Sequence, residues 1–141
     1  MAIEKAPAGR LGLARVIELP SHGDERGVLT AVEAGVDIPF EIRRAYFLHH
    51  IVAERGGHAH RDTHQLVIAL AGCFELSLSD GRDSRSFRLD SPTQGLLFGP
   101  MLFIRMRSFD PGTRALMLAS THYDSKRSIR SWEDYLEAIA P

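Results

Sequence analysis

The chain has 141 residues and a mass of 15.7 kDa, and its 17 Lys and Arg against 18 Asp and Glu give a formal net charge of -1. This near-neutral balance argues against a partner held by bulk charge, so we expect neither nucleic acid nor a membrane surface as partner. The length is typical of a single domain over residues 1–141, which can bury a sizeable core without disulfide bonds.

The first part of the chain is predicted to contain short strands separated by turns. Residues 1–12, which include Pro7 and two glycines, are expected to form a loose arm. Ser21-His22-Gly23-Asp24 has the residue types of a tight turn, and the segment after it is expected to open a strand. The predicted strands are 13–19, 28–33 and, around an aromatic-rich run, 40–52.

Strand signals are stronger in the second part of the chain. Residues 64–71 form a short and mostly apolar run, which is typical of a strand buried on both faces. Residues 74–79 alternate between apolar and polar side chains, and Asp80-Gly81 after them is a strong hairpin signal. Further strands are predicted over 82–89, 95–100, 102–107 and 114–120.

The C-terminus changes character from strand to helix. Ser131-Trp132-Glu133-Asp134 matches a capping box, with acidic residues that complement the helix dipole. Apolar side chains then recur at helical spacing, which predicts a short helix over 132–140. Many short strands with turns about every ten residues, plus one terminal helix, indicate an all-β antiparallel sandwich or barrel.

The compartment is predicted from cysteine usage and from the lack of targeting signals. Cys73 is the single cysteine and has apolar neighbours, so we expect a buried, inert thiol in a reducing environment. No apolar run approaches the ~20 residues of a membrane span, and the N-terminus lacks the apolar core of a signal peptide. These observations predict a cytoplasmic protein.

The chemistry is expected to centre on Arg55-Gly56-Gly57-His58-Ala59-His60. Successive side chains of a strand point to opposite faces, so His58 and His60 would share one face with a small residue between them. Imidazole titrates near neutral pH and also binds metals. The pair is therefore interpreted as an acid/base couple or as half of a metal site, the alternative being an exposed strand without a role.

The spacing around this pair resembles the first signature of the cupin jelly rolls, in which His58, His60, Gln65 and Gly72 would be the matching positions. The position of Gln65 is usually a glutamate in that superfamily. The second cupin signature needs another histidine, but Ile104 and its neighbour Arg105 stand where it should lie. The metal set is incomplete, because stable zinc or iron sites usually have three or four protein ligands. We therefore predict no metal, with a metal-dependent, dioxygenase-like cupin as the alternative.

A narrower resemblance runs in register from about residue 13 to 139. The segments that carry it are Arg26-Gly27-Val28-Leu29, 39–46, 55–60, Gln65, Asp80-Gly81, 89–92, Gly95-Leu96 with Gly99-Pro100, 118–120 with Tyr123-Asp124, and Ile129-Arg130. In these segments the chain resembles the dTDP-4-keto-6-deoxyglucose 3,4-ketoisomerases. The resemblance implies a cupin jelly roll, a homodimer, a dTDP-linked nucleotide-sugar substrate, and catalysis without a metal or other cofactor.

The resemblance also implies roles for individual residues. His58 would be the base that acts on carbon, and His60 would move a proton between the two sugar oxygens. The candidates for binding the rest of the substrate are Arg44 and Arg55 for the diphosphate, Tyr46 and Gln65 as hydrogen-bond partners in the cavity, and Arg26, which matches one branch of the family. Arginine suits phosphate because its planar fork matches the phosphate oxygens.

The chain departs from the family after its Gly-Pro corner. Members usually have Trp followed by His or Arg there, facing the sugar, whereas this chain has Phe103 and Ile104. Arg105 is offset by one residue, and on a strand that offset points a side chain to the other face. The departure leaves the epimer formed at C4 open, and it keeps a non-catalytic sugar-nucleotide binding module as an alternative.

Overall fold

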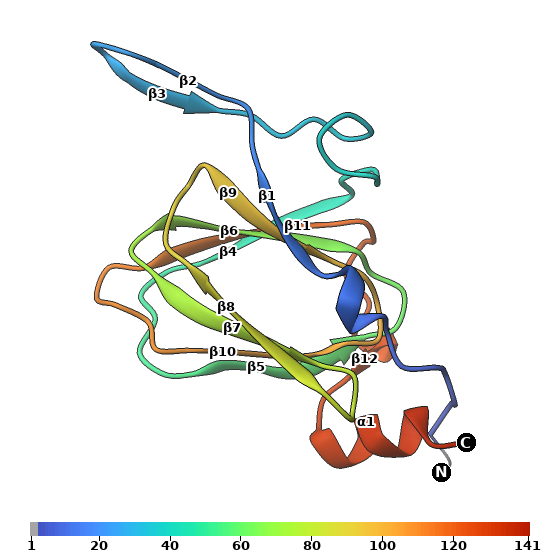
Figure 1. Cartoon of the computed structure of the whole chain (residues 1–141). Helices are drawn as coiled ribbons and strands as arrows, with labels where there is room; N and C mark the ends of the chain where they lie inside the picture. The colour runs from blue at the N-terminus through green and yellow to red at the C-terminus, as the bar shows by residue number, and fades with distance from the viewer. Residues whose placement is uncertain (1–2) are drawn as a thin grey trace.

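Two five-stranded antiparallel sheets face each other in a computed structural model that describes residues 3–141 (Figure 1). The first sheet has the order β1 (Arg15–Glu18), β9 (Gln94–Phe98), β6 (Gln65–Ala71), β11 (Arg114–Ala119), β4 (Arg44–Leu48). The second has the order β12 (Ser128–Ile129), β5 (Arg55–His60), β10 (Phe103–Arg107), β7 (Phe74–Ser79), β8 (Ser84–Leu89). The predicted all-β jelly roll with one C-terminal helix, α1 (Trp132–Ile139), is confirmed.

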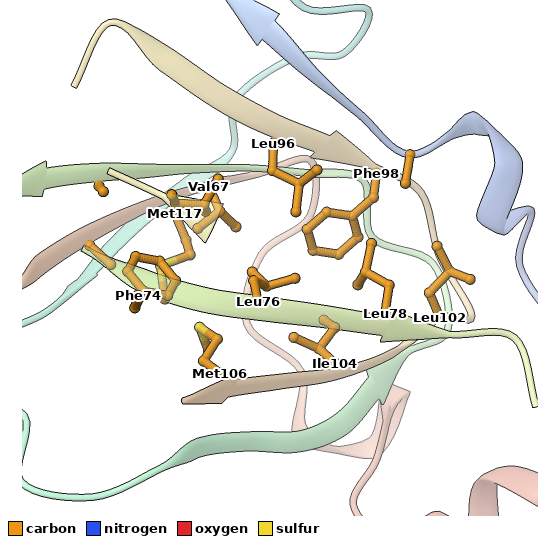
Figure 2. Packing of buried hydrophobic residues seen from close by; sticks show 14 of the residues in the cluster. Val67, Phe74, Leu76, Leu78, Leu96, Phe98, Leu102, Ile104, Met106 and Met117 are labelled. Carbon is orange, nitrogen blue, oxygen red and sulfur yellow. The ribbon is translucent and has the colours of Figure 1, made fainter. Parts of the chain in front are cut away.

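The main core lies between the two sheets and is built from alternate residues of each strand. Phe74, Leu76 and Leu78 of β7 point inward and are fully buried, as the alternation of residues 74–79 predicts (Figure 2). Val67 of β6 belongs to the same core, whereas its neighbour Leu66 packs on the opposite face of the first sheet. Strand β6 is therefore buried on both faces, as predicted.

Helix α1 covers the outer face of β5. Ala59 is completely buried there, in a cluster with Phe103 and with Tyr135 and Ala138 of the helix. The Ser131 hydroxyl caps the helix by accepting a hydrogen bond from the backbone N–H of Asp134 at 3.1 Å. The predicted helix is thus present and ends one residue earlier than expected. Because it takes the outer face of β5, the residues on either side of Ala59 must face the interior.

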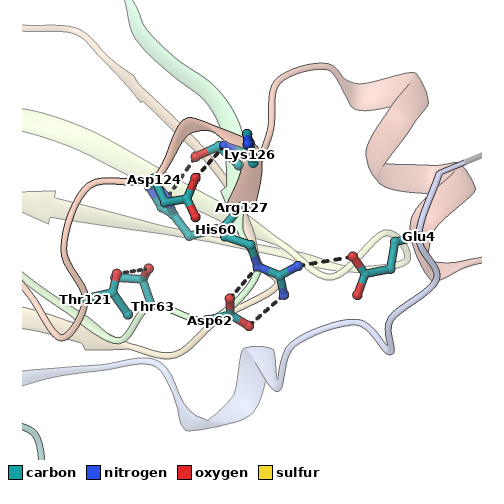
Figure 3. Close-up of polar contacts among 9 residues, drawn as sticks. Glu4, His60, Asp62, Thr63, Thr121, Asp124, Lys126 and Arg127 are labelled. Carbon is teal, nitrogen blue, oxygen red and sulfur yellow. Dashed lines mark hydrogen bonds and ion pairs between the residues drawn. The ribbon is translucent and has the colours of Figure 1, made fainter.

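The N-terminal segment follows the edge of the second sheet without forming a strand. The N–H of Ala6 donates to the carbonyl of Ala138 at 2.9 Å, and that of Gly9 donates to the carbonyl of Met101 at 2.7 Å. A short 3-10 helix, η1 (Leu11–Leu13), then precedes β1. Near the start of the chain, the Glu4 carboxylate pairs with the guanidinium of Arg127, which also binds Asp62 (Figure 3). The segment expected to be a loose arm is held at these points.

The residues predicted to form a turn at 21–24 form a strand instead. Strand β2 (Ser21–Asp24) pairs with β3 (Gly27–Thr30), and the turn lies at the two residues between them. The prediction was wrong because every residue of β2 is exposed, so the strand needs no apolar alternation; backbone pairing with β3 and a hydrogen bond between the Ser21 and Thr30 hydroxyls hold it. The β2–β3 hairpin projects away from the two sheets (Figure 1).

Two other sequence-based expectations concern Cys73 and the membrane. Cys73 is buried, and its thiol donates a hydrogen bond to the Asp110 carboxylate at 2.9 Å. This hydrogen bond is the main cause of a raised pKa for the thiol, which fits an inert cysteine. Within residues 3–141, no helix has the length and apolar character required to cross a membrane.

Candidate active site

A cavity of about 810 Å3 lies between the two sheets. Core side chains from both sheets, among them Val67, Leu76 and Phe98, give it an apolar lining on one side. Its polar lining comes from strands β4, β5 and β6 and from the segment around β12. The predicted site residues that line it are Arg44, Tyr46, Arg55, His58, His60 and Gln65. Three consecutive strands, of which β4 and β6 belong to the first sheet and β5 to the second, thus bring these six side chains into one site.

The two histidines of β5 share the face that looks into this cavity. Ala59 between them points to α1, so His58 and His60 point inward, as the strand periodicity predicts. Their ring centroids are 4.7 Å apart and the ring planes are inclined by 77°. This edge-to-face arrangement lets both rings reach the same small molecule while their nitrogens point in different directions.

Burial sets the protonation state of both rings. It is the largest cause of the lowered pKa of His58, and the nearby Arg130 guanidinium acts in the same direction. Burial, followed by the charges of His58, Arg44 and Arg130, lowers the pKa of His60 from 6.5 to about 4. Both imidazoles are therefore neutral at pH 7, which is the form that accepts protons.

Gly56 allows β10 to approach β5 beside the histidines. Its φ is +95°, and a Cβ there would lie 2.7 Å from the carbonyl oxygen of Ile104. Glycine is the residue that tolerates both this backbone conformation and this contact. The β5–β10 register shifts at this point, between Ile104 and Arg105.

Tyr46 and Gln65 form a hydrogen-bonded pair in the cavity. The amide nitrogen of Gln65, which is almost completely buried, donates to the Tyr46 hydroxyl oxygen at 3.0 Å. Since the amide supplies that hydrogen, the phenol keeps its own hydrogen to donate elsewhere in the cavity. Burial, opposed by the charge of Arg44 and by the Gln65 hydrogen bond, raises the pKa of Tyr46. Tyr46 is thus a neutral hydrogen-bond donor.

The cavity carries several arginines without acidic partners. Arg44 lies over the rings of Tyr46 and Tyr123, with its guanidinium carbon 4.8 Å and 5.6 Å from their centroids, and its buried Nε has no hydrogen-bond partner. Arg55 and Arg130 also line the cavity. Within residues 3–141, none of these three arginines takes part in an ion pair. Glu54 also lines the cavity but forms no ion pair with them, so the three guanidinium groups are available to an anionic ligand.

Arg130 and Tyr123 are cavity residues to which the sequence interpretation gave no role. They come from the segment that leads into β12 and α1, and Arg130 Nη2 lies 3.4 Å from the Tyr123 hydroxyl. Both residues lie in segments that carry the resemblance to the 3,4-ketoisomerases, and this was the sequence signal that could have marked them as site residues. Local patterning carried none, because β12 has only two residues.

Arg26 does not reach this cavity within the chain. It lies in the turn of the exposed β2–β3 hairpin, where its Nη2 pairs with the Asp24 carboxylate at 2.6 Å. The adjacent hairpin side chains Val28 and Leu29 are 68% and 63% exposed. The hairpin therefore presents apolar surface and a guanidinium away from the molecule's own site.

Ile104 takes the inward position on β10. It is the cross-strand partner of His58, is 3% exposed and lines the cavity, whereas Arg105 is exposed on the opposite face, over the Phe103 ring. Within residues 3–141, no group of three or more His, Cys, Asp or Glu side chains is placed to hold a metal ion. The two rings alone fall short of the three or four ligands that zinc or iron sites usually have.

The fold and the site define a small jelly-roll protein with a paired-histidine, arginine-rich cavity suited to acid/base chemistry on an anionic ligand. The family model described as "FdtA: WxcM-like, C-terminal" matches residues 13–140. The chain is 35% identical over 128 residues to the TDP-4-oxo-6-deoxy-alpha-D-glucose-3,4-oxoisomerase of Aneurinibacillus thermoaerophilus, with 89% of this chain and 92% of that protein covered.

Solved structures give the same result. QdtA, a sugar 3,4-ketoisomerase from Thermoanaerobacterium thermosaccharolyticum in complex with TDP, superposes with a TM-score of 0.87 at 33% identity, covering 92% of this chain and 96% of QdtA. A 3,4-ketoisomerase from Helicobacter canadensis gives a TM-score of 0.87 at 34% identity, covering 90% and 97%. The chain belongs to the FdtA family of sugar-nucleotide 3,4-ketoisomerases.

Proposed function

We propose that this chain moves the keto group of a dTDP-4-keto-6-deoxyhexose from C4 to C3, in the biosynthesis of a deoxysugar. The observation that carries the proposal is the pair of neutral imidazoles, 4.7 Å apart, in a cavity that also holds uncompensated arginines. A structure of a QdtA variant contains TDP-4-keto-6-deoxyglucose, which makes this sugar nucleotide the first substrate to test.

The reaction needs one group for carbon and another for oxygen. His58 removes the proton from C3, which leaves an enediolate across C3 and C4, and returns a proton to C4. His60 takes the hydroxyl proton from the oxygen on C3 and delivers it to the oxygen on C4, so that the product is a 3-ketone with a hydroxyl at C4. Each acid/base contribution of this kind is typically worth ~100- to 10,000-fold in rate.

Tyr46 and Gln65 support the charge that develops on the substrate. The Tyr46 hydroxyl accepts from Gln65 and keeps its own hydrogen for a sugar oxygen. A donor fixed in advance in a cavity with little water stabilises an enediolate more than a donor that must reorient. An amide at position 65 also avoids the repulsion that a carboxylate would exert on the enediolate.

The nucleotide's diphosphate is assigned to the arginines. Arg44 and Arg55 are the candidates from the sequence, and Arg130 joins them because it lines the same cavity without an acidic partner. The guanidinium of Arg44 lies over two tyrosine rings, which restrict its movement. A planar, fixed fork suits two phosphate oxygens at once.

Arg26 and the homodimer belong to one proposal. The hairpin that carries Arg26 presents Val28 and Leu29 to solvent, and exposed apolar side chains favour contact with another protein surface. In a homodimer, this hairpin would lie against the partner subunit and bring Arg26 to the partner's substrate.

We place the protein in the cytoplasm, where a free cysteine such as Cys73 stays reduced.

The experiment that tests the function is turnover in deuterated water. The protein, dialysed against a chelator, is incubated with dTDP-4-keto-6-deoxyglucose and the sugar ring is followed by proton NMR, beside a His58→Asn variant. We expect a 3-keto sugar whose C4 carries deuterium, and no product from the variant. The ring couplings give the epimer at C4. Activity that disappears on chelation and returns with added metal would overturn the metal-free mechanism.

The second candidate function is a sugar-nucleotide binding module without turnover. Ile104 favours it, because a hydrocarbon side chain is the cross-strand partner of His58, where the sequence resemblance predicts a polar one. Binding of dTDP-4-keto-6-deoxyglucose by calorimetry, with an unchanged NMR spectrum, would replace the isomerase by this module.

A further inference from the structure

The two ring nitrogens of His60 have different surroundings. Ser128 is the cross-strand partner of His60 in the β5–β12 pair, and its hydroxyl oxygen lies 3.4 Å from Nδ1. The other nitrogen, Nε2, is buried and has no hydrogen-bond partner among the described residues. His60 lines the substrate cavity, Nε2 is its nitrogen without a protein partner, and Nδ1 is the nitrogen that Ser128 contacts.

Ser128 stands at the boundary between two cavities. A smaller cavity of about 380 Å3 adjoins the first, and both are lined by Ser128 and His60. The hydroxyl can therefore contact Nδ1 on one side while its own hydrogen turns toward the polar second cavity. A hydroxyl both accepts and donates, so one group can serve both contacts.

The strand that carries Ser128 is held firmly. Arg61 donates its backbone N–H to the carbonyl of Arg127 at 2.9 Å, and the Arg127 guanidinium binds Asp62 and Glu4 (Figure 3). Asp124 caps the short helix η2 (Ser125–Arg127) before the strand through the N–H of Lys126. These contacts fix the Ser128 hydroxyl relative to β5, although β12 has only two residues.

We propose that Ser128 is a positioning residue that holds His60 with its hydrogen on Nδ1, so that Nε2 presents a lone pair to the substrate. The proposal rests on the function proposed above, in which His60 moves a proton between two sugar oxygens. It adds a residue to which neither the sequence nor the comparisons give a role.

This tautomer sets the order of the two proton transfers. A neutral His60 with hydrogen on Nδ1 can take the hydroxyl proton from the oxygen on C3 through Nε2, become an imidazolium, and give the same proton to the oxygen on C4. The opposite tautomer places a hydrogen on Nε2 and would have to give it to the oxygen on C4 before it could accept the proton from the oxygen on C3. The hydrogen bond at one ring nitrogen determines which nitrogen carries the proton. The lowered pKa of His60 agrees with a ring that is neutral before the reaction.

The test compares Ser128→Ala, Ser128→Thr and a matched control, Ser77→Ala, in protein with 15N-labelled histidine. Ser77 is a partly buried strand serine outside both cavities. The 15N shifts of a neutral imidazole show which nitrogen carries hydrogen, and a His60→Asn sample identifies the His60 signals. We expect hydrogen on Nδ1 in the wild type, Ser128→Thr and Ser77→Ala, and a shift toward Nε2 in Ser128→Ala.

Kinetics supply the second readout. We expect Ser128→Ala to lower kcat roughly ten- to a hundredfold with little change in KM, since removing a whole acid/base group costs ~100- to 10,000-fold. Ser128→Thr should restore most of the loss. If the wild type is active, the proposal is overturned when Ser128→Ala keeps the same His60 tautomer or the same kcat as the wild type. A wild type without turnover refutes the proposed function instead, and the NMR result still decides the contact between Ser128 and His60.

Discussion

Ile104 is the direct cross-strand partner of His58, and both side chains face the cavity. This contact contributes to the burial that lowers the pKa of His58. We expect Ile104→Thr to raise that pKa toward its ordinary value of 6.5, because a hydroxyl and its water solvate the charged ring. Ile104→Val has nearly the same shape without the hydroxyl and serves as the control. A histidine titration by NMR that gives the same pKa in both variants would contradict this account.

The two histidines should fail in different ways. His58→Asn should abolish exchange of the C3 proton with deuterated water, because no base remains for carbon. His60→Asn should retain that exchange while formation of the 3-keto sugar falls by ~100- to 10,000-fold, since only the oxygen proton transfer is lost. Proton NMR of the C3 and C4 signals distinguishes the two steps, and the reverse pattern would exchange the roles of His58 and His60.

Acid should destabilise the protein through His60. Its pKa is 6.5 when unperturbed and about 4 in the folded protein, so below pH 6.5 the unfolded chain binds a proton that the folded chain does not. Stability from this group is complete above pH 6.5 and falls toward pH 4, by on the order of 3 kcal/mol. Urea unfolding between pH 7 and pH 4 measures the effect.

The control for this pH dependence is a matched substitution at an exposed histidine. His60→Asn should make the stability curve less steep between pH 6.5 and 4, with the contribution of His58 remaining, whereas His22→Asn, on the exposed strand β2, should leave the curve as in the wild type. Equal curves for both variants would show that another group causes the acid sensitivity.

The arginines should control nucleotide affinity. We expect Arg55→Ala or Arg130→Ala to raise the Kd for TDP roughly ten- to a hundredfold, because hydrogen bonds to charged groups contribute about 1.5–3 kcal/mol. Arg55→Lys should lie between Ala and the wild type, since it keeps the charge but loses the planar fork. Arg82→Ala, in an exposed turn, is the control for calorimetry. If neither alanine variant changes the affinity for TDP, these arginines do not bind the diphosphate.

The hairpin should control assembly. Light scattering is expected to give about 31 kDa, twice the monomer mass of 15.7 kDa, and Leu29→Glu should lower it by placing a charge in the contact. Leu136→Glu on α1, at the opposite end of the molecule in Figure 1, is the control. A wild-type mass of 15.7 kDa would refute the homodimer.

Much of the fold could be predicted because its determinants are local. The alternation of residues 74–79, the Asp80-Gly81 turn and the Ser131 cap each depend on residues close in sequence, and each is found where expected. The shared face of His58 and His60 also follows from strand geometry alone. Local rules predict these features because they need no knowledge of which strands pair.

The remaining features depend on contacts between distant segments. Strand β2 has no buried side chain, and β12 is defined only by its pairing with β5, so neither has a hydrophobic pattern to detect. Arg130 and Ser128 reach the cavity through that pairing. The place of Arg26, on a hairpin away from the site, is likewise a property of the whole fold.

The strand that carries the histidines is completed by segments that follow it far along the chain. Its outer face is covered by α1 (Trp132–Ile139), and one of its edges pairs with β12 (Ser128–Ile129). A nascent chain that has emerged only as far as β11 already contains both imidazoles but neither of these supports. The histidine strand can therefore be enclosed only after the chain as far as α1 has been synthesised, so termination before β12 should leave the two imidazoles without their edge strand and covering helix.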